Sequence, residues 1–126
     1  MAAKILVVDD DESMRDLLRL HLSSAGYEVS IAPDGIAAGY QVLHRPPDLI
    51  LCDVNMPDMD GFEFVAALRS DATLPHIPVI FLTSDEEGDQ RGKELGAVGY
   101  LTKPVHADRL LKLVGQHVPG GAIPIG

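Results

Sequence analysis

The sequence predicts an α/β fold, a doubly wound domain in which a five-stranded parallel sheet is covered by helices on both faces. Three observations indicate this fold. Five strand-like segments alternate with segments of helical length, a pattern typical of βα repetition. Two of the strand-like segments, residues 5–8 and 49–52, are apolar throughout, as strands buried on both faces are. A chain of 126 residues with 46% hydrophobic content is long enough to bury one core.

The first helix has a well-marked start and end. Five strands are expected, at residues 4–8, 28–32, 49–52, 79–82 and 99–102. The first helix lies between the first two of them. The carboxylate of Asp11 can cap its first turn, and Gly26 ends it. Its expected inner face recurs at helical spacing and consists of Met14, Leu17, Leu18, His21, Leu22 and Ala25.

Three further helices are predicted from their apolar faces. The second runs from residue 34 or 35 to residue 44, before Pro46-Pro47. Its expected inner face is Ile36, Ala37, Tyr40 and Leu43. The third covers about residues 61–70 and presents Phe62, Val65 and Leu68. The last, residues 107–117, is amphipathic through Ala107, Leu110, Leu111, Val114 and Val118.

The helix expected between the fourth and fifth strands is poorly encoded. Residues 85–94 contain no apolar side chain, and Gly88 and Gly92 interrupt them. Each glycine costs about 1 kcal/mol relative to alanine, with almost no buried face to offset it. We therefore expect a short, mobile or displaced helix there. The last eight residues, 119–126, have no periodicity and are expected to be a flexible tail after a domain of residues 1–118.

The composition excludes several classes of function. The formal net charge of −9 argues against nonspecific binding to nucleic acid, because too few basic residues are present to neutralise several phosphates. No apolar run is long enough to cross a membrane, and residues 1–4 lead into a strand instead of a signal peptide, so a cytoplasmic location is expected. The single Cys52 is expected to be a small buried hydrophobe. The five histidines form no ligand-like pair, and no glycine-rich phosphate loop follows the first strand.

Acidic residues follow two of the predicted core strands. Asp9 and Asp10 come after the first strand, and Asp53 comes after the third. Because open α/β sheets place their ligands at the carboxyl ends of the strands, these carboxylates are expected to converge there. Their mutual repulsion is costly without a cation, which predicts a divalent metal site. Mg2+ would be bound by Asp10, Asp53 and the main-chain carbonyl of Asn55, with Mn2+ as an alternative ion. Asp9 would act on the metal through water.

Two further residues are expected at the same edge of the sheet. Thr83 follows the fourth strand and Lys103 follows the fifth. Each has a role if the chemistry is phosphoryl transfer. Asp53 would be the nucleophile and would form an acyl phosphate. Lys103 would pair with one phosphoryl oxygen, and Thr83 would donate a hydrogen bond to another.

Simpler interpretations of these residues stay open. One of the acids from Asp9 to Asp11 could serve only as a helix cap. Thr83 could simply end a strand, and Lys103 with the following proline could form a plain turn. Asp53 is the hardest to explain in this way, because a charge at the end of an apolar strand is costly without a partner.

Taken together, the motifs resemble the receiver domain of two-component response regulators over residues 4 to about 118. The matching segments are Ile5-Leu6-Val7-Val8-Asp9-Asp10, Asp48-Leu49-Ile50-Leu51-Cys52-Asp53-Val54-Asn55-Met56-Pro57, Met59-Asp60-Gly61, Phe81-Leu82-Thr83-Ser84 and Gly99-Tyr100-Leu101-Thr102-Lys103-Pro104. The similarity is to the single-domain, chemotaxis-type regulators. It implies a flavodoxin-like sheet with strand order 2-1-3-4-5.

The resemblance implies a function in phosphorelay signal transduction. Asp53 would accept a phosphoryl group from the phosphohistidine of a sensor histidine kinase or a histidine phosphotransfer protein, or from a small donor such as acetyl phosphate. Such a protein is not an enzyme beyond catalysing its own phosphorylation and dephosphorylation. Asn55 and Asp85 would tune the hydrolysis of the acyl phosphate. The peptide bond between Lys103 and Pro104 is usually cis in this family.

The resemblance also implies a conformational switch. Phosphorylation would draw the hydroxyl of Thr83 inward and turn Tyr100 from exposed to buried, although Tyr100 could also be a half-buried edge aromatic without that role. The output partner would be a protein, with no direct binding to DNA or membranes, and a homodimer on phosphorylation is a further expectation. The interval from Thr83 to Lys103 is shorter than is usual, which leaves the family's common dimer mode open.

Two other classes of function compete with this one. A Mg2+-dependent phosphohydrolase with an aspartyl-phosphate intermediate would also use Asp, Thr and Lys, but it generally needs an acid two residues after the nucleophile. That position is Asn55. A phosphorylation-independent docking module is the third class, and the presence of Asp10, Asp53, Thr83 and Lys103 argues against it.

Overall fold

The structure alternates strands and helices through the described part of the chain. In this computed structural model, residues 2–56, 59–84 and 89–118 are described. The elements are β1 (Lys4–Val8), α1 (Glu12–Ser24), β2 (Glu28–Ala32), α2 (Gly35–His44), β3 (Leu49–Asp53), α3 (Gly61–Ser70), β4 (Val79–Thr83), α4 (Asp89–Glu94), β5 (Gly99–Thr102) and α5 (Ala107–His117).

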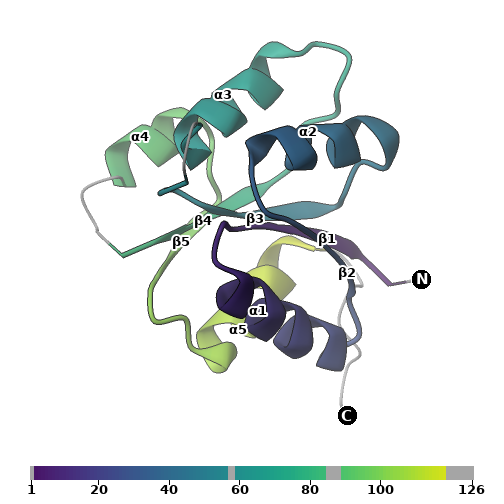
Figure 1. Cartoon of the computed structure of the whole chain (residues 1–126), viewed down its shortest axis with the longest axis vertical. Coiled ribbons are helices and arrows are strands. Elements are labelled where there is room, and N and C mark those ends of the chain that lie inside the picture. The colour runs from purple at the N-terminus through teal and green to yellow at the C-terminus, as the bar shows by residue number, and fades with distance from the viewer. Residues whose placement is uncertain (1, 57–58, 85–88, 119–126) are drawn as a thin grey trace.

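The five strands form one parallel sheet with the order β2-β1-β3-β4-β5. Helices α1 and α5 cover one face of the sheet, and α2, α3 and α4 cover the other (Figure 1). The predicted doubly wound fold and its strand order are therefore confirmed. Because β1 and β3 are neighbours, with Val8 opposite Cys52, the residues that follow these two strands are brought side by side.

The core explains why the central strands are continuous apolar runs. Every residue of β3 and of β4 is buried, since each side of the sheet carries its own layer of helices. Cys52 has no exposed surface, which confirms the prediction that it packs as a small hydrophobe. Both strands extend one residue further than predicted, to Asp53 and Thr83, so these two polar residues belong to the sheet itself.

The start of α1 is fixed by the predicted cap. The Asp11 carboxylate accepts hydrogen bonds from the backbone N–H groups of Ser13 at 2.9 Å and Met14 at 3.4 Å. Gly26, just beyond the helix, has a φ of 96°, a conformation that favours glycine. Leu18 faces the core as predicted, but the prediction for Leu17 was wrong, because this side chain is 42% exposed.

The predicted inner face of α2 was also wrong in three of its four positions. Ile36, Tyr40 and Leu43 are exposed, whereas Ala38 and Val42 are buried against the sheet. The reason is that α2 carries apolar side chains around most of its circumference, so hydrophobic periodicity does not distinguish its two sides.

The fourth helix is short, as predicted: α4 has six residues. The adjoining residues 85–88 and the predicted tail, residues 119–126, lie outside the part of the chain that the structure describes. Within the described part, no helix is both long and apolar enough to cross a membrane.

Candidate functional site

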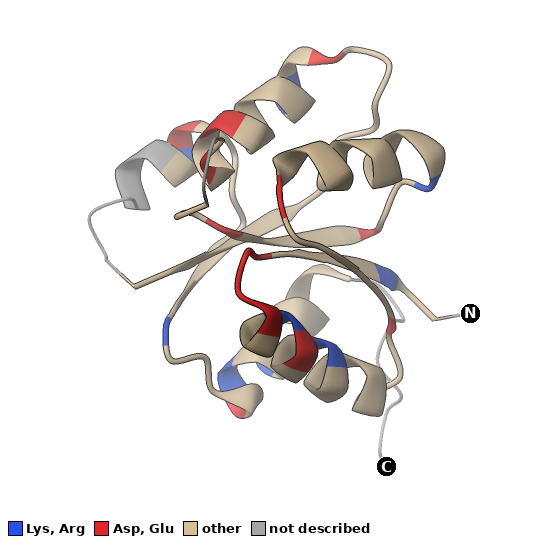
Figure 2. Ribbon diagram, in the orientation of Figure 1, with Lys and Arg blue, Asp and Glu red and all other residues tan. Residues whose placement is uncertain are grey.

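Four predicted site residues come together at the carboxyl edge of the sheet. Asp9 follows β1, Asp53 ends β3, Thr83 ends β4 and Lys103 follows β5. Figure 2 shows acidic residues concentrated around the end of β1 and the start of α1. The side chains of Asp9, Asp53 and Thr83 are all buried, with residue exposures of 0%, 2% and 4%. Buried carboxylates of this kind need a charged or metal partner.

Asp9 is held in place through its backbone and one carboxylate oxygen. Its N–H donates to the carbonyl of Ala32 at 3.1 Å, and its own carbonyl accepts a hydrogen bond from Arg15 Nη1 at 2.8 Å. Asp9 Oδ1 accepts from the N–H of Asp11 at 2.9 Å. The second oxygen, Oδ2, is buried and accepts no hydrogen bond from any described residue. Its nearest charged neighbour is the ammonium group of Lys103, at 3.3 Å.

Asp53 is positioned by the turn that leads into α3. Its Oδ1 accepts a hydrogen bond from the N–H of Asn55 at 3.2 Å, and the N–H of Gly61 donates to the carbonyl of Val54 at 2.9 Å. A side chain at residue 61 would collide with the main-chain carbonyl oxygen of Asp53. Only a glycine allows α3 to begin this close to the end of β3.

Lys103 supplies the positive charge between the two buried acids. Its Nζ lies 3.3 Å from Asp9 Oδ2 and 3.4 Å from Asp53 Oδ2. The backbone N–H of Lys103 donates to the carbonyl of Thr83 at 2.8 Å, which fixes the start of the loop after β5. The Lys103–Pro104 peptide bond is cis, as the resemblance implies.

The environment shifts the pKa values of both partners upward. Burial raises the pKa of Asp53 from its ordinary 3.8 to about 6, the charge of Asp9 adds to this, and Lys103 and the Asn55 N–H partly offset it. Burial alone lowers the pKa of Lys103, but the charges of Asp53 and Asp9 outweigh it and the pKa is raised. One ammonium group thus neutralises the acidic cluster only in part.

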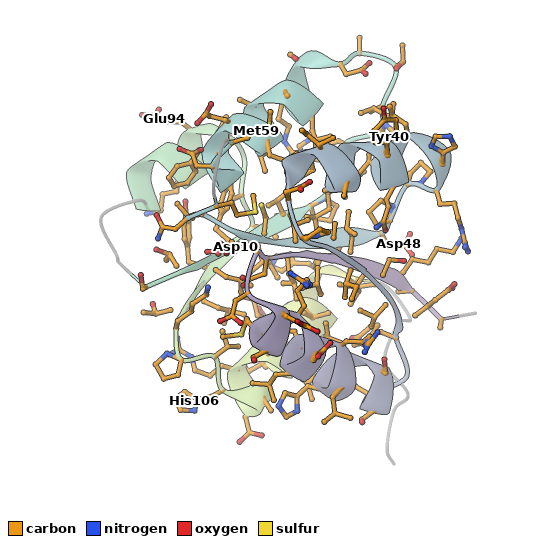
Figure 3. All side chains as sticks on the ribbon, in the orientation of Figure 1. Asp10, Tyr40, Asp48, Met59, Glu94 and His106 are labelled. Carbon is orange, nitrogen blue, oxygen red and sulfur yellow. The ribbon has the colours of Figure 1, made fainter. Side chains whose placement is uncertain are left out.

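The acids fit a hard divalent cation. Carboxylate oxygens of Asp9, Asp10 and Asp53 lie within 4.8 Å of one another. All are oxygen ligands of the kind that Mg2+ prefers. Asp10 is exposed, and Figure 3 places it at the end of β1, whereas Asp48 lies at the other end of the sheet. The structure brings these three acids together as predicted; the Asn55 carbonyl as a ligand stays a prediction.

The predicted switch residues lie beside the site. Thr83 is buried at the end of β4. Tyr100 is half-buried, and its ring centroid lies 5.8 Å from that of Phe81 in β4. The hydroxyl of Tyr100 occupies the space that a side chain at Gly92 would need. Asp85, the predicted tuning residue, lies outside the described residues.

Sequence reasoning missed the roles that three residues have in shaping this edge of the sheet. Gly61 and Gly92 act by having no side chain, so only the contacts of the folded chain show their role. Arg15 has its guanidinium on the main-chain carbonyl of Asp9. Its position about one turn into the helix that follows Asp9 is the one sequence feature that could have indicated it.

The family model of the response regulator receiver domain matches residues 5–115 of this chain. The chain belongs to the response regulator receiver domain family. Among curated relatives, this receiver domain is 48% identical over 107 residues to response regulator PleD of Caulobacter vibrioides (strain NA1000 / CB15N), covering 83% of this chain and 24% of PleD. It is 41% identical over 113 residues to response regulator MprA of Mycobacterium sp. (strain KMS), covering 88% of this chain and 48% of MprA. The receiver domain thus spans a quarter to a half of these relatives.

Solved structures of similar length show the same fold. The chemotaxis protein CheY4 of Vibrio cholerae superposes with a TM-score of 0.87 at 41% identity, covering 94% of this chain and all of CheY4. A putative response regulator from Chloroflexus aurantiacus J-10-fl also gives a TM-score of 0.87, at 34% identity, covering 92% of this chain and 97% of that one. The receiver domain is therefore similar to relatives of its own size as well as to parts of longer proteins.

Proposed function

We propose that this receiver domain accepts a phosphoryl group on Asp53 in a Mg2+-dependent reaction and passes the signal on by switching partner binding. The observation that carries the proposal is the position of Lys103, whose Nζ lies within 3.4 Å of Asp53 and 3.3 Å of Asp9. A plain turn would not require a lysine to reach back to two buried carboxylates. The raised pKa of Asp53, about 6, leaves it ionised near neutral pH and available as a nucleophile.

The chemistry follows from the charges at the site. A carboxylate oxygen of Asp53 attacks phosphorus, and the O–P bond forms as the N–P bond to the donor imidazole breaks and leaves its electron pair on nitrogen. Lys103 then pairs with a phosphoryl oxygen instead of the carboxylate. Mg2+ held by Asp10, Asp53 and the Asn55 carbonyl, with Asp9 acting through water, would neutralise further charge on the phosphoryl group. Hydrolysis of the acyl phosphate by water resets Asp53, so the protein acts only on itself.

The donor and the output are part of the proposal. A phosphohistidine donor, either a sensor histidine kinase or a histidine phosphotransfer protein, supplies the phosphoryl group. The naming of PleD and MprA as response regulators supports this class of donor. Thr83 and Tyr100 carry the change from the phosphoryl group to the surface near α4, where an output protein would bind.

Intact-mass spectrometry tests the proposal directly. We expect the protein incubated with Mg2+ and acetyl phosphate to gain one labile phosphoryl group, and the Asp53→Asn variant to gain none. Asp16→Asn, an exposed acid on α1, is the matched control and should be modified like the wild type. An unmodified wild type would overturn the proposal. Rapid hydrolysis of many phosphate esters would instead favour a phosphohydrolase.

A further inference from the structure

The outer face of α2 is an exposed apolar surface that includes none of the site residues. Among the described residues, five large hydrophobic side chains are exposed, and three of them lie on α2: Ile36 at 66%, Tyr40 at 64% and Leu43 at 59%. The other two, Leu17 and Leu20, lie on α1 across the sheet. Tyr40, labelled in Figure 3, also lines a cavity of about 320 Å3 beside the N-terminal ends of β1 and β2, the end opposite Asp53.

The spacing of these residues is that of a helix–helix seam. Ile36, Gly39, Tyr40 and Leu43 follow the i, i+3, i+4, i+7 pattern and form one stripe, which we call the α2 seam. No charged residue occurs between Gly35 and Leu43. The opposite side of the helix is already buried through Ala38 and Val42. A helix that is apolar on all sides is typical of one covered on all sides.

Gly39 makes the α2 seam complementary to itself. A side chain at this position would meet nothing within 4 Å, so the helix surface is open there beside the bulky Tyr40. We propose that the α2 seam binds the α2 seam of a second copy of this chain, with the two helices antiparallel. A two-fold axis between residues 39 and 40 would place each Tyr40 ring over Gly39 of the second copy. The same axis would set Ile36 against Leu43 of the second copy.

The charges at the two ends of the seam favour the antiparallel arrangement. The same axis would bring Asp34, which caps the start of α2, opposite Arg45, which follows its last residue. The Arg45 side chain is 70% exposed and pairs with Glu28 at 3.3 Å, so its guanidinium has room to turn toward a second carboxylate. Antiparallel helices also set the positive end of each helix dipole beside the negative end of the other. A parallel pair would bring like charges together at both ends.

The size of the contact predicts a weak dimer. A helix of ten residues is about 15 Å long, so the seam buries less than the ~800 Å2 per partner that is typical of stable complexes. We therefore expect dissociation in the micromolar range or weaker. None of Asp9, Asp53, Thr83 and Lys103 lies on α2, so we expect this association to be independent of phosphorylation.

Sedimentation equilibrium of the unphosphorylated chain, from micromolar to millimolar concentration, tests the proposal. We expect a monomer–dimer equilibrium that Ile36→Glu weakens at least about tenfold, equivalent to 1.4 kcal/mol. Leu20→Glu, at 62% exposure on α1, is the matched control and should leave the equilibrium unchanged. A wild type that stays monomeric throughout would overturn the proposal and would mean that a different protein, or chain outside the described residues, covers the seam. Equal weakening by both variants would also overturn it.

Cysteine cross-linking tests the antiparallel register. The native Cys52 is fully buried, so oxidation reports on introduced cysteines only. A mixture of Ile36→Cys and Leu43→Cys chains should form a disulfide-linked heterodimer. Ile36→Cys alone should not, because seven residues separate the two positions and place the Ile36 sites of an antiparallel pair about 10 Å apart along the helix, beyond disulfide reach. Efficient self-linking of Ile36→Cys would indicate a parallel pair and contradict the register.

Discussion

The hydroxyl of Tyr100 lies in the space that a side chain at Gly92 would fill. The tyrosine comes from β5 and the glycine from α4, so the contact joins the edge of the sheet to the shortest helix of the fold. The tilted ring of Tyr100 lies 5.8 Å from Phe81, which is next but one to Thr83 along β4. The half-buried position of Tyr100 therefore depends on the absence of a side chain at residue 92.

We predict that Gly92→Ala expels the Tyr100 ring toward solvent. The ring cannot share its present position with a methyl group, although alanine otherwise favours the helix. The chain has three tyrosines, so in a Tyr27→Phe, Tyr40→Phe background nitration by tetranitromethane reports on Tyr100 alone. Nitration should be several-fold faster in the Gly92→Ala protein.

Gly115→Ala in α5 provides the control for this experiment. A side chain at residue 115 would come within 4 Å of the Tyr27 hydroxyl alone, which the Tyr27→Phe background removes, so the substitution should leave the nitration rate of Tyr100 unchanged. Equal nitration rates in the two alanine variants would show that α4 moves to make room for the new methyl group and that the Tyr100 ring keeps its position. That result would contradict the prediction.

The sequence correctly predicted the elements that depend on local chemistry. It did not predict the buried face of a helix that has apolar residues on both sides. The apolar runs of β3 and β4 and the cap at Asp11 require no knowledge of distant residues, and the structure contains them. The convergence of Asp9 and Asp53 followed from parallel strand order alone. The inner face of α2 did not follow, because apolar residues lie on both of its sides and only the fit against the sheet decides between them.

We predict that Asp53→Asn stabilises the metal-free protein at neutral pH. The pKa of Asp53 is raised from 3.8 to about 6, so the folded protein binds a proton more tightly than the unfolded chain does between these values. Stability contributed by this group is therefore present at low pH and is lost as the pH rises through about 6. The asparagine has no such loss, and the gain should be on the order of 2 kcal/mol at pH 7.5.

Urea denaturation in EDTA at pH 7.5 and at pH 4 measures this effect. The difference between Asp53→Asn and wild type should shrink as the pH falls toward 4. Asp16→Asn, an exposed acid with one weak pairing to Arg19, should change stability by no more than about 0.5 kcal/mol at either pH. A variant less stable than wild type at pH 7.5 would show that burial of Asp53 carries no net cost.

We predict that Gly61→Ala destabilises the protein by about 1–3 kcal/mol through overpacking. The new methyl group would collide with the carbonyl oxygen of Asp53, so the start of α3 must move away from the end of β3. Gly39→Ala in α2 has nothing within 4 Å of the new carbon and should be neutral or slightly stabilising. Urea denaturation of both variants at micromolar concentration distinguishes them. Equal stabilities would contradict the close approach of residue 61 to the carbonyl oxygen of Asp53.

We predict that Asp10→Asn weakens Mg2+ binding at least about tenfold, because ligand charge sets the affinity of a hard cation. Asp10 belongs to the cluster whose carboxylate oxygens lie within 4.8 Å of one another. The neighbouring Asp11 instead directs its carboxylate to the N–H groups of α1, and Asp11→Ser keeps a cap there. Isothermal titration with Mg2+ should therefore give near wild-type affinity for Asp11→Ser. Because the metal competes with a proton on Asp53, affinity in the wild type should also fall as the pH drops below about 6. Equal losses in the two variants would mean that overall negative charge, and not ligation by Asp10, attracts the ion.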